Sequence, residues 1–230
     1  TVNKAPLTVT AEDFTITYGD SAPVDYTAVY SGFIGNDTEK DLGGMLALNC
    51  IYDKGSNAGS YEIMPGGISS VNYKIKYVAG SLIVKPKDIN IQAQNKRIVY
   101  GDDAPLFTAD CIGLVNGDTV ADIVGLHYNC SYTAGSNAGE YTISVSSGNN
   151  DNYNINYITG TLTVDKKNIT VTAEDKTVTY GDNIPDYTIT AEGLAGTDTL
   201  TDLGTLSFDC VYAFGAEIGS YSIVLNNLNN

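Results

Sequence analysis

Tyr18-Gly19-Asp20, followed by Pro23, is the stretch that decides the fold, because it occurs three times in the 230 residues of the chain. The glycine allows a backbone conformation that a Cβ would oppose, and the aspartate can accept hydrogen bonds from nearby amides. The proline ends strand pairing. The motif therefore predicts a strand followed by a corner in each of three tandem repeats. The other two copies are Tyr100-Gly101-Asp102 with Pro105 and Tyr180-Gly181-Asp182 with Pro185.

Aligning the three copies gives the domain organisation. We predict repeat 1 at residues 5–85, repeat 2 at residues 86–165 and repeat 3 at residues 166–230, the last truncated before its closing strand. Residues 1–4 align with the end of a closing strand, so we interpret them as the tail of a preceding repeat. Neither linker contains a Gly/Ser-rich stretch, which predicts an elongated, semi-rigid array. The linkers are Lys85-Pro86-Lys87 and Asp165-Lys166-Lys167.

Alternating apolar residues predict short strands with one buried face. The opening strand of repeat 1, for example, places Leu7, Val9 and Ala11 on one face. One helical signal occurs per repeat, at residues 37–42, 118–123 and 198–203, each beginning with an aspartate that we predict to be the N-cap. The fold class is therefore mainly β, with one short helical turn in each repeat. We predict small β-grasp-like domains, and immunoglobulin-like β-sandwich repeats are the alternative.

The charge balance excludes several partners. The formal net charge is −15 and the isoelectric point is near 4.1. Binding to nucleic acid or to an anionic membrane surface needs a basic patch, so we expect neither. No apolar run approaches the ~20 residues of a membrane span, so we expect no direct membrane insertion.

The residues that catalysis needs are scarce, and we predict that the protein is not an enzyme. His127 is the only histidine and is expected on the outward face of its strand. We expect no catalytic residue and no cofactor. Calcium is the one metal considered, because acidic loops can supply oxygen ligands, with N-capping and surface charge as the alternative. The candidate ligands recur four residues apart in each repeat: Asp37, Asp41, Asp118, Asp122, Asp198 and Asp202.

The cysteines are best interpreted by their position in the repeat. Cys50, Cys130 and Cys210 are equivalent and are predicted to be small core residues. Cys111 has no cysteine equivalent. A Cys111–Cys130 disulfide is sterically conceivable because both residues read inward, and buried free thiols are the alternative. Most tyrosines also read inward, whereas Tyr73 and Tyr153 are candidates for an exposed platform that stacks on sugars.

Several signatures together resemble the MBG/YDG type of repeat found in bacterial surface adhesins. They are residues 7–13, Tyr18-Gly19-Asp20 with its proline, residues 113–119, Gly139 with Tyr141, Asn152-Tyr153 and residues 160–164. The resemblance covers essentially the whole chain. It implies a secreted or wall-attached protein whose units are related to mucin-binding β-grasp modules.

Two functions are consistent with these observations. The first is a non-catalytic stalk or spacer of a bacterial adhesin, located at the cell surface or cell wall, whose repeats contact one another and are candidates for binding host glycans or mucin. The second is a carbohydrate-binding accessory module of an extracellular enzyme. An elongated particle favours the stalk or spacer. Tight glycan binding by the isolated repeats favours the carbohydrate-binding module.

Overall fold

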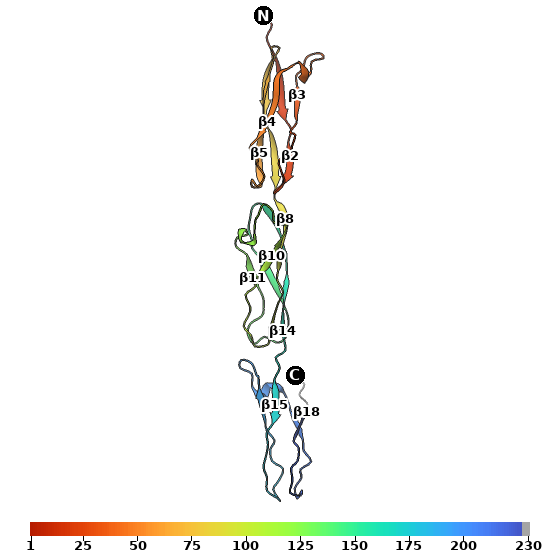
Figure 1. Ribbon diagram of the computed structural model, residues 1–230, viewed down its shortest axis with the longest axis vertical. Helices are drawn as coiled ribbons and strands as arrows, with labels where there is room; N and C mark the ends of the chain where they lie inside the picture. Colours follow the sequence, from red (N-terminus) through yellow and green to blue (C-terminus); the bar gives the residue numbers. More distant parts are fainter. Residues whose placement is uncertain (227–230) are drawn as a thin grey trace. The chain divides into compact units, whose positions relative to one another are not determined.

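The computed structural model describes residues 1–226 and is mainly β (Figure 1). These residues contain short strands in several small sheets and three short 3-10 turns, and no α-helix, so the predicted fold class is confirmed. The chain forms two compact units, and each unit combines segments of consecutive repeats. Unit 1 consists of Thr1–Gln94, Thr108–Asn129 and Ser144–Thr159, and unit 2 of Asn95–Phe107, Cys130–Ile143 and the described part of Gly160–Asn230.

Repeat 1 lies entirely in unit 1 and contains two sheets. Its elements in chain order are β1 (Ala5–Ala11), β2 (Phe14–Thr17), β3 (Ala28–Ser31), η1 (Glu39–Asp41), β4 (Gly43–Cys50), β5 (Gly59–Ser69), β6 (Tyr73–Val78) and β7 (Gly80–Lys85). In the first sheet β1 lies between antiparallel β3 and parallel β6. In the second sheet the order is β2-β7-β5-β4, with β7 parallel to β2 and antiparallel to β5.

The core of repeat 1 lies between these two sheets. Leu7 and Val9 of β1 are fully buried, as are Ile63 of β5 and Leu82 of β7. The alternation predicted for the opening strand is confirmed, since Leu7, Val9 and Ala11 are at most 3% exposed. Because β7 is the strand between β2 and β5, it pairs with both through its backbone, and its side chains Leu82 and Val84 are buried in the core between the two sheets.

Repeat 2 has the same sequence of elements. They are β8 (Lys87–Ala93), β9 (Lys96–Val99), β10 (Ala109–Ile112), η2 (Val120–Asp122), β11 (His127–Asn129), β12 (Gly139–Ser146), β13 (Tyr153–Ile158) and β14 (Gly160–Asp165). Within unit 1, β8 pairs with β10 and β13, and β11 pairs with the end of β12. Within unit 2, β14 pairs with β9 and with the beginning of β12.

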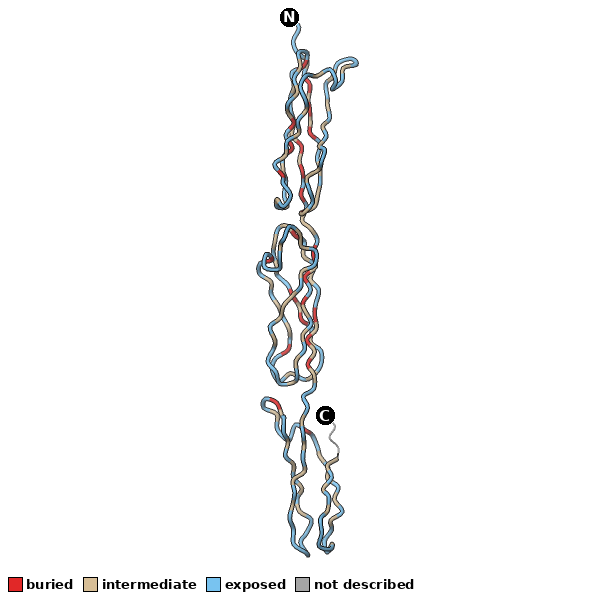
Figure 2. Tube along the Cα trace, in the orientation of Figure 1, coloured by how far each residue is buried: buried red, intermediate tan, exposed pale blue. Residues whose placement is uncertain are grey.

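Repeat 3 has two separate two-stranded sheets among its described residues. Its elements are β15 (Thr170–Ala173), β16 (Ile189–Glu192), η3 (Leu200–Leu203), β17 (Ser207–Asp209) and β18 (Val224–Asn226). β15 pairs with β16, and β17 pairs with β18. Figure 2 shows buried residues along the strands of repeats 1 and 2, whereas repeat 3 is mostly exposed or half-buried. Residues 227–230, which end the predicted third repeat, lie outside the described residues.

The three 3-10 turns confirm the predicted short helical segments and correct the predicted caps. The capping residues are Thr38, Thr119 and Thr199, one position after the aspartates that we expected. Each threonine forms a capping box, because its backbone amide donates to the carboxylate three residues later. These bonds measure 2.8 Å to Asp41, 2.8 Å to Asp122 and 2.7 Å to Asp202. The preceding aspartates are therefore available for other contacts.

Candidate functional sites: the tyrosine–aspartate junctions and the groove of repeat 3

The motif tyrosine of repeat 1 makes a contact with repeat 2 inside unit 1. Tyr18 follows β2, and a turn positions it in which the Asp20 carboxylate accepts from the Thr17 amide at 2.9 Å. The Tyr18 ring is 4% exposed, and its hydroxyl donates to Asp118 Oδ2 at 3.1 Å. Its ring also meets the Tyr153 ring edge to face, with the centroids 5.3 Å apart. The motif that decides the fold thus also joins two repeats.

Asp118 accepts from two tyrosines at this junction. In addition to Tyr18, the Tyr153 hydroxyl donates to Asp118 Oδ2 at 2.5 Å. Burial and this hydrogen bond raise the pKa of Tyr153 to about 12. The phenol is therefore a permanent donor at neutral pH, and the carboxylate is held by two hydroxyls that are shielded from water.

Close backbone packing and a second polar contact complete the first junction. Gly19 has a φ of +93°, and a Cβ there would lie 2.6 Å from Val115 Cγ2, so only glycine fits. The turn after β4 docks as well, because Asn152 Oδ1 accepts from the Ala58 amide at 2.8 Å. The Asn152 side-chain amide donates to Asn57 Oδ1 at 3.1 Å.

Unit 2 contains an equivalent junction between repeats 2 and 3. The Tyr100 hydroxyl donates to Asp198 Oδ1 at 3.1 Å. This hydrogen bond, together with burial, raises the pKa of Tyr100 above its ordinary value. A Cβ on Gly101 would lie 2.5 Å from the Ala195 Cβ. A small cavity of about 90 Å³ lies beside this contact and is lined by Tyr100, Lys167, Ile169, Gly193, Leu194, Ala195, Asp198, Asp202 and Leu203.

Each of the six aspartates considered for calcium accepts a hydrogen bond from a protein group. Asp41, Asp122 and Asp202 close the capping boxes, and Asp118 and Asp198 accept from junction tyrosines. Asp37 accepts from the Tyr73 hydroxyl at 2.6 Å. Within residues 1–226 no three His, Cys, Asp or Glu side chains form a group suited to a metal ion. The sequence did not reveal the tyrosine partners, because they lie 35 to 100 residues away in the chain.

The capping boxes predict a specific pH dependence. Hydrogen bonds from Thr119 and Thr199 lower the pKa of Asp122 and Asp202 below the ordinary 3.8. A pKa that is lower in the folded state stabilises the fold above the unfolded pKa, and this stabilisation is lost as the pH falls through the folded pKa. We expect the melting temperature to decrease between about pH 5 and about pH 2.

NMR titration of the aspartate carboxyl signals measures the two pKa values directly. The Asp122→Asn variant keeps an acceptor oxygen but cannot ionise, so its melting temperature should depend less on pH than that of the parent chain. Carboxyl signals of Asp122 and Asp202 that titrate at or above 3.8 would contradict the capping-box assignment.

The histidine and the two tyrosines that the sequence made candidate site residues lie within strands. His127 is exposed in β11, where it pairs with Ser146. Tyr73 and Tyr153 are 4% and 6% exposed, so the prediction of an exposed sugar-stacking platform at these residues is wrong. Each begins a strand and donates its hydroxyl to an aspartate, which explains why the ring lies inside.

All four cysteines are free thiols and half-buried, so the equivalent cysteines are less buried than the predicted core positions. Burial and the nearby Asp110 carboxylate raise the pKa of the Cys111 thiol. We expect four thiols per chain when the protein is denatured without reductant and titrated with a thiol reagent. In the folded protein, Cys111 should react slowly because little thiolate is present. A count of two thiols would instead show that one disulfide is present.

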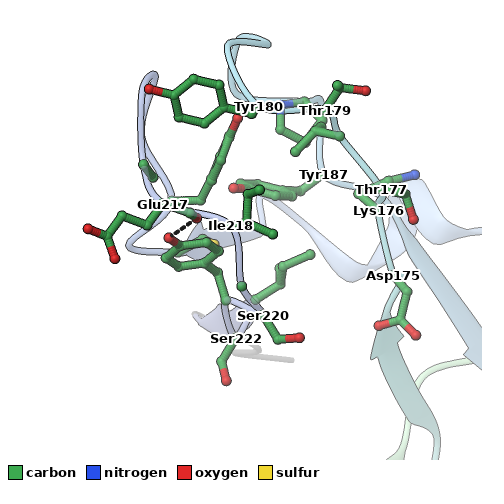
Figure 3. Close-up of a pocket in the computed structure, with 18 of the residues that line it drawn as sticks. Asp175, Lys176, Thr177, Thr179, Tyr180, Tyr187, Glu217, Ile218, Ser220 and Ser222 are labelled. Carbon is green, nitrogen blue, oxygen red and sulfur yellow. Dashed lines mark hydrogen bonds between the residues drawn. The ribbon is translucent and has the colours of Figure 1, made fainter.

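Repeat 3 contains an open groove of about 720 Å³. Its two walls are residues 175–180 and residues 216–223, and the Tyr187 ring lies between them (Figure 3). One wall follows β15 and the other precedes β18, and neither wall is paired with a strand among the described residues. The groove is polar along its rim, where Asp175, Thr177, Ser220 and Ser222 lie.

The repeated sheets and the repeated tyrosine–aspartate contact define a tandem β-repeat protein. Comparison with protein families matches the MBG domain (YGX type) at residues 7–83, 89–163 and 169–230. The chain therefore belongs to this family, in three tandem copies, and the resemblance inferred from the sequence is confirmed. Such repeat domains are typical of bacterial surface proteins.

No curated protein matches the chain. The three family matches include no catalytic domain. Among the residues that the structure describes, no helix has the length and apolar character needed to cross a membrane.

Proposed function

We propose that the chain is a non-catalytic stalk or spacer region of a bacterial adhesin, exposed at the cell surface or in the cell wall. The observation that supports this most directly is the tyrosine–aspartate junction. Tyr18 donates to Asp118 in unit 1, and Tyr100 donates to Asp198 in unit 2. A contact that is repeated at each boundary fixes one repeat on the next, as a spacer requires.

Short connections between repeats support the same proposal. Only Pro86 separates β7 from β8. Proline has a fixed φ and no amide hydrogen, so this connection has little freedom. A stiff connection together with a side-chain contact limits bending at the boundary between repeats 1 and 2.

Solution scattering tests the stalk proposal. A compact globule of 230 residues would have a radius of gyration of about 17 Å. A stalk should give a clearly larger value that does not change with protein concentration. A Tyr18→Ala, Tyr100→Ala double variant should lose the junction contacts and show a broader distribution of interatomic distances. A radius of gyration near that of a globule would reject the proposal.

Contact with host glycans or mucin is the finer part of the proposal. The acidic net charge of −15 disfavours sialylated or sulfated glycans, so neutral sugars are the expected class if the repeats bind glycans. A glycan array probed with the full chain separates the two roles. A spacer leaves the array unlabelled, whereas selective labelling would assign adhesion to the repeats themselves.

A further inference from the structure

We propose that Asn116 and Gly117 form a self-modifying site, at which deamidation of Asn116 loosens the junction between repeats 1 and 2. The chain contains a single Asn-Gly dipeptide, and it is this one. It lies in the turn that precedes Asp118, the aspartate that accepts from both junction tyrosines. The proposal rests on the geometry of this turn and does not depend on the stalk function.

The turn at Asn116 differs from its equivalents in the other two repeats. Asn116 has a φ of +59° and Gly117 a φ of +88°, and positive values at both central residues are typical of a type I′ turn. Repeats 1 and 3 place the glycine first, in Gly35-Asn36 and Gly196-Thr197. In repeat 2 the asparagine is therefore followed by a residue without a side chain.

The two reacting groups are accessible. Asn116 and Gly117 are both exposed. A Cβ on Gly117 would have no neighbour within 4 Å, so the space beside its backbone is open. Within residues 1–226 no hydrogen bond engages the Gly117 amide. Because glycine also has a wide range of backbone conformations, its nitrogen can approach the Asn116 carboxamide.

The reaction needs only the chain and water. The Gly117 nitrogen loses its proton to water or hydroxide and attacks Asn116 Cγ. The Cγ–Nδ2 bond breaks, and the leaving nitrogen takes a proton from water and departs as ammonia, which leaves a cyclic succinimide. Water then opens the ring. Opening at the Cγ carbonyl gives aspartate, whereas opening at the backbone carbonyl gives isoaspartate, in which the chain continues through the side-chain carbon.

Isoaspartate would lengthen the turn on which the junction depends. It adds one C–C bond, about 1.5 Å, to the backbone. The turn is closed by the Asp118 amide, which donates to the Val115 carbonyl at 3.0 Å. Val115 packs against Gly19, and its amide donates to the Tyr153 hydroxyl at 3.1 Å. Since Val115 and Asp118 contact the junction from opposite ends of the turn, a longer turn would displace one relative to the other.

Both products also carry a new carboxylate. It would lie two residues from Asp118, in a chain whose formal net charge is already −15. Like charges repel, but water and salt weaken this repulsion at an exposed position. We therefore expect the aspartate product to loosen the junction less than the isoaspartate product.

Ageing of the folded full chain in mildly alkaline buffer tests the proposal. Peptide mapping should find the mass change of deamidation, the replacement of NH by O, at Asn116 before any other asparagine. An isoaspartyl methyltransferase with a labelled methyl donor should detect the isoaspartate. In the modified fraction, separated by charge, hydrogen exchange at residues 17–20 and 115–118 should be at least about tenfold faster. Exchange in β5 and β7 should not change.

Two matched variants separate the chemistry from its consequence. The double variant Asn116→Gly, Gly117→Asn has the residue order of repeat 1 and the composition of the parent chain. It should resist ageing, because its asparagine precedes an aspartate whose side chain hinders attack by the backbone nitrogen. Asn116→Asp adds the charge without lengthening the backbone. Its hydrogen exchange at the junction should lie between that of the fresh chain and that of the isoaspartate fraction.

Two results would overturn the proposal. One is an Asn116 that stays intact in the aged folded chain while a free peptide of residues 112–122 is modified, which would show that the turn protects the asparagine. The other is unchanged hydrogen exchange at residues 17–20 and 115–118 in the isoaspartate fraction, which would show that the junction tolerates the longer turn.

Discussion

Replacing Leu82 by alanine should destabilise repeat 1 by about 2–5 kcal/mol. Leu82 is fully buried at the centre of β7. Its removal leaves a cavity in the core between the two sheets, on the inner face of β7, which pairs with both β2 and β5. The loss includes both the transfer free energy of the side chain and the cost of that cavity. The effect should therefore reach both neighbouring strands.

Ile83→Ala is the matched control for Leu82→Ala. Ile83 lies in the same strand but faces outward and is 38% exposed. Its truncation should therefore change the free energy of unfolding much less. Urea unfolding measures the difference in the free energy of unfolding between the two variants. Hydrogen exchange of β2 and β5 shows whether the effect reaches these strands. Equal destabilisation by the two substitutions would show that β7 does not pack with the side-chain alternation described above.

Replacing Asp118 by alanine should destabilise unit 1 by about 2–4 kcal/mol. The substitution removes the acceptor of both Tyr18 and Tyr153, whose rings are 4% and 6% exposed. Two buried hydroxyl groups would then lack this partner, and each costs free energy because it has already lost its hydration. Asp118→Asn retains one acceptor oxygen and should lose less.

Asp37→Ala is the matched control for Asp118→Ala. Asp37 occupies the equivalent position in repeat 1 and accepts from a single tyrosine, Tyr73. Its substitution should therefore destabilise the chain less than Asp118→Ala. A double-mutant cycle between Asp118→Ala and Tyr18→Phe isolates the coupling across the junction. A coupling free energy indistinguishable from zero would contradict a contribution of this hydrogen bond.

Much of the fold could be predicted from the sequence because its signals are local. Alternation identified the buried face of the opening strand, where Leu7 and Val9 are fully buried. The helical turns were predicted from aspartates and apolar residues at short spacing, although Thr38 and its equivalents are the caps. The threonine and the preceding aspartate are both good N-cap residues, so local preference did not distinguish them.

The junctions could not be predicted because they depend on distant residues. The sequence indicated that Tyr18 faces inward, yet its partner Asp118 is 100 residues away. Tyr153 was a candidate for an exposed platform, whereas it begins β13 and meets the Tyr18 ring. Only the pairing of strands brings these side chains together.

The tyrosine–aspartate junction also has an evolutionary consequence. Each repeat carries both halves of the joint, for example the acceptor Asp118 and the donor Tyr100 in repeat 2. Unequal recombination that duplicates or deletes one whole repeat would again place a motif tyrosine beside the acceptor aspartate of the following repeat. Gene variants that differ in copy number should therefore preserve the joint without compensating substitutions. The length of the array can then change in a single genetic event.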